Sequence, residues 1–238
     1  MSGVHGRAED AREDAREDAA HAGPGSAADR VRRAAVRIAA LAQDGLVYAV
    51  GEPSKDYDAA RYRELGELAA DLLAAVSDTP REVLRLVLDA DAGYATPKVD
   101  VRAAVVDERE RFLMLRERSD GLWSLPGGWA DPGDRPGEAA VREVLEETGY
   151  PVEVVKVVGV WEREARGKQP PMPVSVFHLY FLCRAVGEPV AASQLETLDV
   201  GWYGLDELPP LSLRRIDRWE LERVIAHHRD PSLPTEWD

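Results

Sequence analysis

Apolar residues recur every three or four positions between residues 28 and 95, which is the spacing of amphipathic helices. We predict a first helix that ends at Gly45, a second over residues 57–76 and a third over residues 81–88. The second carries an apolar face made of Leu65, Leu68, Leu72 and Leu73. Three short helices cannot bury such faces alone, so they should pack on each other, on the rest of the chain or on a second copy of it. We therefore predict a helical domain over residues 28–95 that serves docking or homodimerisation.

From residue 96 onward the pattern changes to short apolar runs bounded by turn residues, which predicts strands. The expected strands cover residues 99–106, 111–116, 152–161, 174–183 and 200–203. The first two are separated by a polar turn and are expected to form a hairpin. Helices are predicted from near Asp134, a capping residue type, and over residues 214–227. This order fits neither a βαβ repeat nor an all-β fold, so we expect an α/β sandwich around a mixed sheet over residues 96–238.

The N-terminal residues 1–27 carry a repeat of Ala-Arg-Glu-Asp and no large apolar residue after Val4. Such a segment has nothing to bury, so we predict a disordered acidic tail.

The formal net charge of the 238 residues is −14, which argues against wrapping extended nucleic acid because phosphate binding needs a basic surface. This sum does not exclude a local basic patch. No apolar segment reaches the ~18–20 residues that span a bilayer, and the N-terminus lacks the apolar core of a signal peptide. We expect a cytoplasmic protein that does not bind membranes.

Residues 142–149 read Arg-Glu-Val-Leu-Glu-Glu-Thr-Gly and predict a helix with an unusual concentration of acid. At ~100° per residue its three glutamates, Glu143, Glu146 and Glu147, share about a quarter of the circumference. Val141, Val144 and Leu145 are expected to anchor the opposite side. Adjacent like charges destabilise a helix by roughly 0.2–0.5 kcal/mol per pair. A hard divalent cation would neutralise them; the alternative is an ordinary solvated acidic face.

The spacing around this helix is specific. Gly128 is followed by five residues and Asp134, then by seven residues and the Arg-Glu-Val-x-Glu-Glu-x-Gly-Tyr sequence ending at Tyr150. This resembles the Nudix box, G-x5-E-x7-R-E-U-x-E-E-x-G-U, of the Nudix hydrolases, where U is a bulky aliphatic residue and x is any residue. Asp134 stands where that family has Glu, and Tyr150 where it has an aliphatic residue. The resemblance covers residues from about 98 to 210.

The N-terminal helical segment resembles the extension of a Nudix subgroup that includes CDP-choline and ADP-ribose pyrophosphatases. The similar stretches are Gly-Leu-x-Tyr at residues 45–48 and Thr-Pro-Lys-Val-Asp-Val-Arg at residues 96–102. The combined resemblance implies a Nudix-type α/β/α sandwich preceded by a small helical domain. It also implies Mg²⁺-dependent hydrolysis, with Mn²⁺ as the alternative ion, of the pyrophosphate in a nucleoside diphosphate linked to another moiety. The products would be a nucleoside monophosphate and a phosphorylated group.

The resemblance also implies roles for single residues. Glu143 and Glu147 would be metal ligands, Glu146 a ligand or a water activator, and Arg142 the group that orients Glu146. Gly127 and Gly128 would let the backbone approach the metal or phosphate, with a carbonyl there as a ligand. The general base varies in location within the family, and Asp199 is one candidate outside the helix.

A second set of residues borders a polar loop that runs through Pro173. Its members Trp161, Arg163, Arg166 and Lys168 would contact the base or a phosphate, or would belong to an ordinary exposed loop. The identity of the base and of the linked group is not legible. Two other functions remain open: removal of pyrophosphate from RNA 5′ ends, and nucleotide sensing by a non-catalytic Nudix fold.

Overall fold

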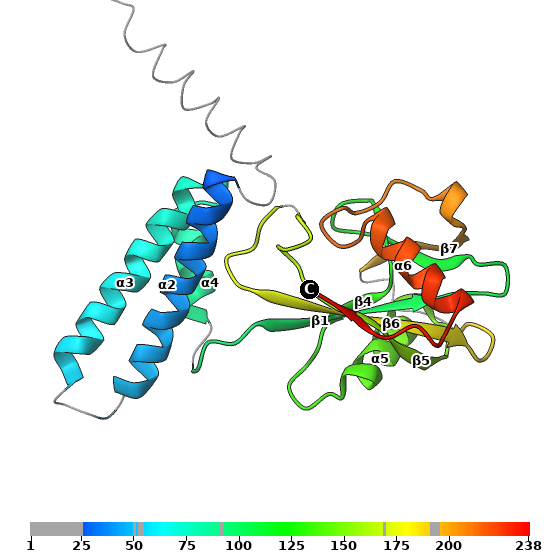
Figure 1. The fold of residues 1–238 in the computed structure, drawn as a ribbon, viewed down its shortest axis with the longest axis horizontal. Helices are drawn as coiled ribbons and strands as arrows, with labels where there is room; N and C mark the ends of the chain where they lie inside the picture. The colour runs from blue at the N-terminus through cyan, green and yellow to red at the C-terminus, as the bar shows by residue number, and fades with distance from the viewer. Residues whose placement is uncertain (1–25, 50, 52–54, 91–92, 169, 191–195) are drawn as a thin grey trace, which may run out of the picture. The chain divides into compact units, whose positions relative to one another are not determined.

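The computed structural model describes residues 26–49, 51, 55–90, 93–168, 170–190 and 196–238. The chain divides into two compact units (Figure 1). One contains the residues up to Pro97 together with 169–175, and the other contains 98–168 and 176–238. All but two residues of the expected acidic tail lie outside the described residues, so its disorder stays a prediction.

The first unit contains helices α2 (Ala27–Ala49), α3 (Asp56–Ala75) and α4 (Arg81–Ala90). The prediction that Gly45 ends the first helix is wrong, because α2 continues to Ala49. Gly45 instead lets α3 approach: ring atoms of Tyr62 lie 2.4 Å from where a Cβ on this glycine would stand. The core of the unit is small, with Ala35, Leu73 and Leu84 at its centre.

Apolar side chains remain exposed on two helices of this unit. On α3, Leu65, Leu68 and Leu72 are between 37% and 50% exposed, although Leu73 is buried. On α4, Leu86 is 71% exposed and lies between the half-exposed Val83 and Val87. Two of the three predicted helices therefore keep apolar surface that their own unit does not cover.

The second unit contains a five-stranded mixed sheet and a three-stranded antiparallel sheet. The larger sheet has the order β4-β1-β6-β5-β8, with β4 Gly127–Trp129, β1 Lys98–Val105, β6 Val176–Ala185, β5 Val152–Glu162 and β8 Glu236–Trp237. The smaller sheet has the order β3-β2-β7, with β3 Trp123–Ser124, β2 Phe112–Glu117 and β7 Thr197–Tyr203. Strand β1 runs parallel to β6 and antiparallel to β4.

The predicted hairpin between β1 and β2 is wrong beyond its first residue pair. The turn is closed by a hydrogen bond from the Asp107 N–H to the Arg111 carbonyl (3.0 Å) and by a single bridge between Val106 and Phe112. The two strands then enter different sheets. Both are buried almost throughout, so hydrophobic pattern alone identifies them as strands without saying which neighbours they pair with.

Helices α5 (Pro136–Thr148) and α6 (Arg218–Arg229) pack against opposite faces of the strands (Figure 1). On the α5 side Val101 and Val144 belong to one buried cluster, and on the α6 side Tyr180 and Ile225 belong to another. This arrangement confirms the expected α/β/α sandwich around a mixed sheet. The short 3₁₀ helix η2 (Leu205–Glu207) lies between β7 and α6 in the chain.

Helix α6 starts four residues later than predicted. Its N-cap is Asp217, which forms a capping box with Glu220, so the preceding residues 212–216 form a turn rather than the first turn of the helix. In the part of the chain that the structure describes, no helix is both long and apolar enough to cross a bilayer.

Helix α5 also differs from the prediction at its start and in its anchor. It begins at Pro136, and Asp134 lies outside it and does not cap it. The buried anchors are Ala139, Ala140 and Val144, whereas Leu145 is 41% exposed. The helix ends at Gly149, which adopts a left-handed conformation (φ 77°) and donates a hydrogen bond to the Leu145 carbonyl.

Replacing Gly149 by Ala tests this helix end. A Cβ there would lie 2.0 Å from the Val190 carbonyl oxygen, in addition to the strain of the positive φ. The matched control is Gly121→Ala, since Gly121 has φ 71° and its nearest neighbour would be 3.8 Å away. The control should lose about 1–2 kcal/mol of unfolding free energy and Gly149→Ala about twice that, measured by urea denaturation. Equal losses would show that the Val190 contact yields without cost.

Candidate active site

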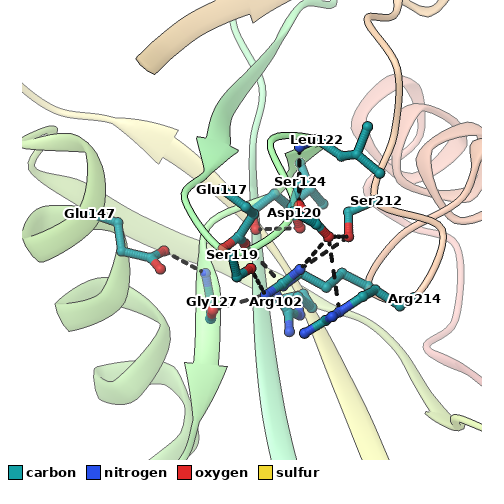
Figure 2. Close-up of polar contacts among 12 residues, drawn as sticks. Arg102, Glu117, Ser119, Asp120, Leu122, Ser124, Gly127, Glu147, Ser212 and Arg214 are labelled. Carbon is teal, nitrogen blue, oxygen red and sulfur yellow. Dashed lines mark hydrogen bonds and ion pairs between the residues drawn. The ribbon is translucent and has the colours of Figure 1, made fainter. Parts of the chain in front are cut away.

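The side chain of Glu147 points from α5 to the edge strand β4 (Figure 2). Its Oε2 accepts a hydrogen bond from the Gly127 N–H at 2.9 Å. The pKa of Glu147 is raised to about 8, chiefly by burial and also by the neighbouring carboxylates of Glu143 and Glu117, while the Gly127 N–H and Arg102 oppose the shift. A carboxyl group is thus held near backbone, in a place that disfavours its charge.

Glu143 lies one turn earlier on α5 and faces the same strand. Its Oε2 is 3.2 Å from where a Cβ on Gly128 would stand, so the glycine makes room for this carboxylate. Burial raises the pKa of Glu143 as well, against the attraction of Arg142. Gly127 has φ 148°, and a Cβ there would lie 2.0 Å from the Val101 carbonyl oxygen. Gly127 therefore requires a residue without a side chain, whereas a Cβ at Gly128 would press on the Glu143 carboxylate.

Arg142 connects the acidic groups around the start of α5. Its guanidinium lies 2.9 Å from Glu143 and 3.3 Å from Glu146, and the second distance agrees with the contact expected from their spacing. It also bonds Asp134 at 3.1 Å and lies 3.7 Å from Asp131. Asp134 is therefore a partner of Arg142. Glu146 is the most open of the three glutamates, with a side chain 57% exposed.

The donor set fits a hard divalent cation in its chemistry. Glu143 and Glu147 are partly buried carboxylates held against a glycine backbone. Glu143 contributes to the raised pKa of Glu147, and Glu146 contributes to that of Glu143. Mg²⁺ prefers oxygen ligands and would relieve this repulsion. Among the described residues, however, no group of three or more His, Cys, Asp or Glu is already clustered as a metal site. The ligand roles of these glutamates stay predictions.

Behind the two glycines, β1 carries a buried ion pair. Arg102 donates from Nε and Nη2 to the two carboxylate oxygens of Asp100 at 2.7 and 2.8 Å. Burial alone would lower the pKa of Arg102, but Asp100 raises it above its ordinary value. Arg102 also reaches the Gly127 carbonyl from Nη1 at 3.4 Å. The neighbouring His178 is held neutral, because burial and the nearby arginines lower its pKa to about 2.

A further carboxylate of this site, Glu117 at the end of β2, was not identified from the sequence. Its side chain is buried, and its Oε1 lies 3.0 Å from Nε of Arg215. Burial raises the pKa of Glu117, and this carboxylate in turn acts on Glu147. The available signal was a carboxylate at the end of a strand whose first four residues are apolar, since such a position buries its side chain only with a partner.

The four residues expected to border a binding loop do not gather at these carboxylates. Trp161 is 1% exposed and packs between Tyr180 and Trp219, and Lys168 is 2% exposed and binds Asp217 and Glu220. These two predictions are wrong because both side chains are committed to the interior.

The two arginines of that set also bind groups of the protein itself. Arg163 is 6% exposed and contacts Glu164 and the Arg214 carbonyl. Arg166 pairs with Asp238 and lies over the ring of Trp219. Their side chains therefore stabilise the structure around α6 and are held by protein groups.

Asp199 lies on β7, opposite Arg116 of β2, and is exposed. Its carboxylate accepts a hydrogen bond from the N–H of the adjacent Val200. Its role as a general base stays a prediction.

The pattern of the NUDIX domain matches residues 96–225, more than half of the chain. The chain belongs to the Nudix family. It is therefore a hydrolase that acts on phosphoric anhydrides, as the resemblance of its acidic helix implied. A second pattern, described as a UDP-X-like N-terminal oligomerisation domain, matches residues 29–88.

Individual relatives agree with this assignment. A putative ADP-ribose pyrophosphatase, YjhB, of Bacillus subtilis (strain 168) is 36% identical over 205 residues, which cover 86% of this chain and 95% of that protein. The crystal structure of an ADP-ribose pyrophosphatase from Streptococcus suis 89-1591 is 36% identical with a TM-score of 0.53, over 60% of this chain and 100% of that one. The crystal structure of a UDP-X diphosphatase is 26% identical with a TM-score of 0.54, over 89% of this chain and 99% of that one.

The burial of Glu147 predicts how metal-free protein responds to pH. Its folded pKa of about 8 is above the ordinary value of 4.5, so protonation favours folding. That stability is complete below about pH 4.5 and is lost as the pH rises through about 8. Glu147→Gln imitates the protonated group and keeps an acceptor for the Gly127 N–H. At pH 8.5 in EDTA this variant should unfold roughly 3–8 °C above wild type, for a gain of about 1–2 kcal/mol after local relaxation.

The control for this measurement is Glu146→Gln, which removes the exposed charge of the same helix and should show no such gain at pH 8.5 relative to pH 5. Added Mg²⁺ should raise the unfolding temperature of wild type more than that of Glu147→Gln. An unchanged difference between the variants across this pH range would contradict the assigned burial of the Glu147 carboxyl group.

Proposed function

We propose that this Nudix hydrolase cleaves the pyrophosphate bond of a nucleoside diphosphate linked to a second moiety. The products are a nucleoside monophosphate and the phosphorylated moiety. The observation that carries the proposal is the pair of partly buried glutamates, Glu143 and Glu147, held against the backbone of Gly127 and Gly128. Such a site offers carboxylates without enough cations to neutralise them, which suits a substrate that arrives with a metal ion.

The cation we propose is Mg²⁺, with Mn²⁺ as the alternative; when bound, it neutralises phosphate charge and activates water. Glu143 and Glu147 are the proposed ligands, with Glu146 at the open rim as a ligand or water activator. The Gly127 carbonyl is a further proposed ligand. Its oxygen has two lone pairs, and the 3.4 Å contact from Arg102 uses at most one of them.

Arg142 is the proposed orienting residue. Its guanidinium already contacts Glu143 and Glu146 on the helix and Asp134 before it, so it holds these carboxylates at fixed separations. The backbone at Gly128, which has no side chain in the way, is proposed to face the substrate phosphates.

ADP-ribose is the first proposed substrate, because two relatives with 36% identity carry that name and match over 95% and 100% of their own lengths. A UDP-linked compound is the second, because the relative that spans 89% of this chain is called a UDP-X diphosphatase. CDP-choline, implied by the resemblance of the N-terminal segment, is the third.

A panel of these three compounds with Mg²⁺ or Mn²⁺, with both products identified, tests the proposal. We expect one nucleoside diphosphate compound to be turned over, and Glu147→Gln to reduce kcat roughly 100-fold or more while the protein stays folded. Glu138→Gln, at an exposed position in the first turn of α5, is the matched control and should keep its activity. Turnover of triphosphorylated RNA in preference to the panel would favour the RNA alternative, and binding without turnover would favour a sensor.

The proposed quaternary structure is a homodimer through the N-terminal unit. The unit matches a domain described as an oligomerisation domain, and α3 and α4 expose Leu68 and Leu86 at 50% and 71%. Apolar surface of this kind on a small helical unit is typical of a contact with another copy.

The double variant Leu68→Glu/Leu86→Glu tests the dimer by light scattering coupled to size exclusion. We expect wild type at twice the mass of the chain and the variant at the mass of one chain, because charges cannot be buried in an apolar contact. Val190→Glu, at a residue 61% exposed in the other unit, should remain dimeric. A wild-type mass of 26.2 kDa would overturn the proposal.

A further inference from the structure

The turn formed by residues 212–216, between Leu211 and α6, carries two arginines beside the candidate active site. It is fixed to β3 by hydrogen bonds from the Trp123 N–H to the Pro210 carbonyl (2.9 Å) and from the Ser212 N–H to the Trp123 carbonyl (2.8 Å). Strand β3 ends at Ser124, only three residues before Gly127. The 212–216 turn therefore lies next to the segment that leads into the glycine pair.

The backbone of this turn is held from within the unit. Arg163 donates from Nη2 to the Arg214 carbonyl at 3.2 Å, and the Tyr180 hydroxyl donates to the Arg215 carbonyl at 3.3 Å. Ile216 is completely buried in the core on the α6 side. These contacts fix where the two arginine side chains start.

Arg215 uses its guanidinium to bind protein groups. Nε contacts Glu117 at 3.0 Å, Nη1 contacts Asp120 at 3.0 Å and the Ser212 hydroxyl at 3.1 Å, and Nη2 contacts the Ser119 hydroxyl at 3.1 Å. Its side chain is 17% exposed. Arg215 thus joins the end of β2 to the turn, and four of its five N–H donors are directed at protein groups.

Arg214 differs from its neighbour in both respects. Its side chain is 48% exposed, and its ion pair with Asp120 is long, at 4.0 Å from Nε to Oδ2. The same Oδ2 accepts shorter hydrogen bonds from Ser212 (2.8 Å) and Arg215 (3.0 Å). The Asp120 carboxylate therefore orients the Arg214 guanidinium without using all of its N–H donors. In Figure 2 the side chains of Glu147 and Arg214 lie on opposite sides of Gly127 and Arg102.

We propose that Arg214 binds a substrate phosphate other than the one nearest the acidic helix, with Asp120 and Arg215 as its positioning residues. A planar guanidinium suits two phosphate oxygens at once, and Arg214 is the most exposed of the three arginines Arg102, Arg214 and Arg215. A diphosphate would then lie between a cation on the α5 glutamates and Arg214. This assignment rests on the proposed function.

The test compares Arg214→Ala and Arg214→Lys with wild type on the nucleoside diphosphate compound that the panel identifies. A bidentate contact made in the bound state should cost Arg214→Ala roughly 10-fold or more in KM, with kcat changed by less than about threefold. Lys keeps the charge and loses the fork, so Arg214→Lys should recover part of the loss. Calorimetry with Mg²⁺ and the non-hydrolysable methylene-bridged analogue of the same compound should show the same order of Kd.

The matched control is Arg218→Ala. Arg218 is a similarly exposed arginine four residues on, but it bonds Glu222 and the Leu205 carbonyl. Its removal should leave KM and Kd within twofold of wild type. An active wild type whose Arg214→Ala variant keeps its KM, or an equal loss in Arg218→Ala, would overturn the assignment alone. A wild type that turns over none of the panel would overturn the proposed function instead.

Discussion

The hydrogen bond between the Gly127 N–H and Glu147 joins the two parts on which this site depends, helix α5 and edge strand β4. It forms only if β4 approaches β1 closely, and this approach leaves 2.0 Å between the Val101 oxygen and any Cβ at Gly127. It also requires α5 to pack closely on the sheet, which the small buried side chains of Ala139 and Ala140 allow. Close packing therefore places the carboxylates against backbone, where their charge is unfavourable without a cation.

Features encoded by local sequence were predicted well. The acidic helix, its glycine entry, the helical N-terminal segment and the mixed α/β class follow from periodicity, spacing and the order of elements. The α/β/α layering was implied by the resemblance to the Nudix hydrolases. The Arg142–Glu146 contact follows from helix geometry in the same way. Errors occurred where a boundary depends on tertiary contacts. Gly45 continues α2 because Tyr62 of another helix packs on it. Helix α6 begins after its N-cap Asp217, whose capping partner Glu220 also binds the distant Lys168.

The cationic half of the site could not be predicted because its parts are far apart in the chain. Arg102, Glu117 and Arg215 meet only after β1 and β2 have entered different sheets, and the hydrophobic pattern of two buried strands does not specify that choice. The sequence instead predicted that cations from the polar loop, among them Arg163 and Lys168, contact the substrate. In the structure those side chains stabilise the surroundings of α6, and Arg163 supports the backbone of Arg214.

Because the net charge of the chain is −14, the binding of an anionic substrate depends on how positive and negative groups are arranged around the glycines. A free diphosphate would be repelled by the chain as a whole and by Glu143, Glu146 and Glu147 in particular. Buried arginines cannot compensate, because Arg102 and Arg215 are already neutralised by Asp100, Glu117 and Asp120. A divalent cation held by these glutamates would offset most of their negative charge on the α5 side, while the exposed Arg214 provides positive charge on the other side. Metal and substrate are therefore expected to bind cooperatively, since each removes a repulsion that the other would meet alone.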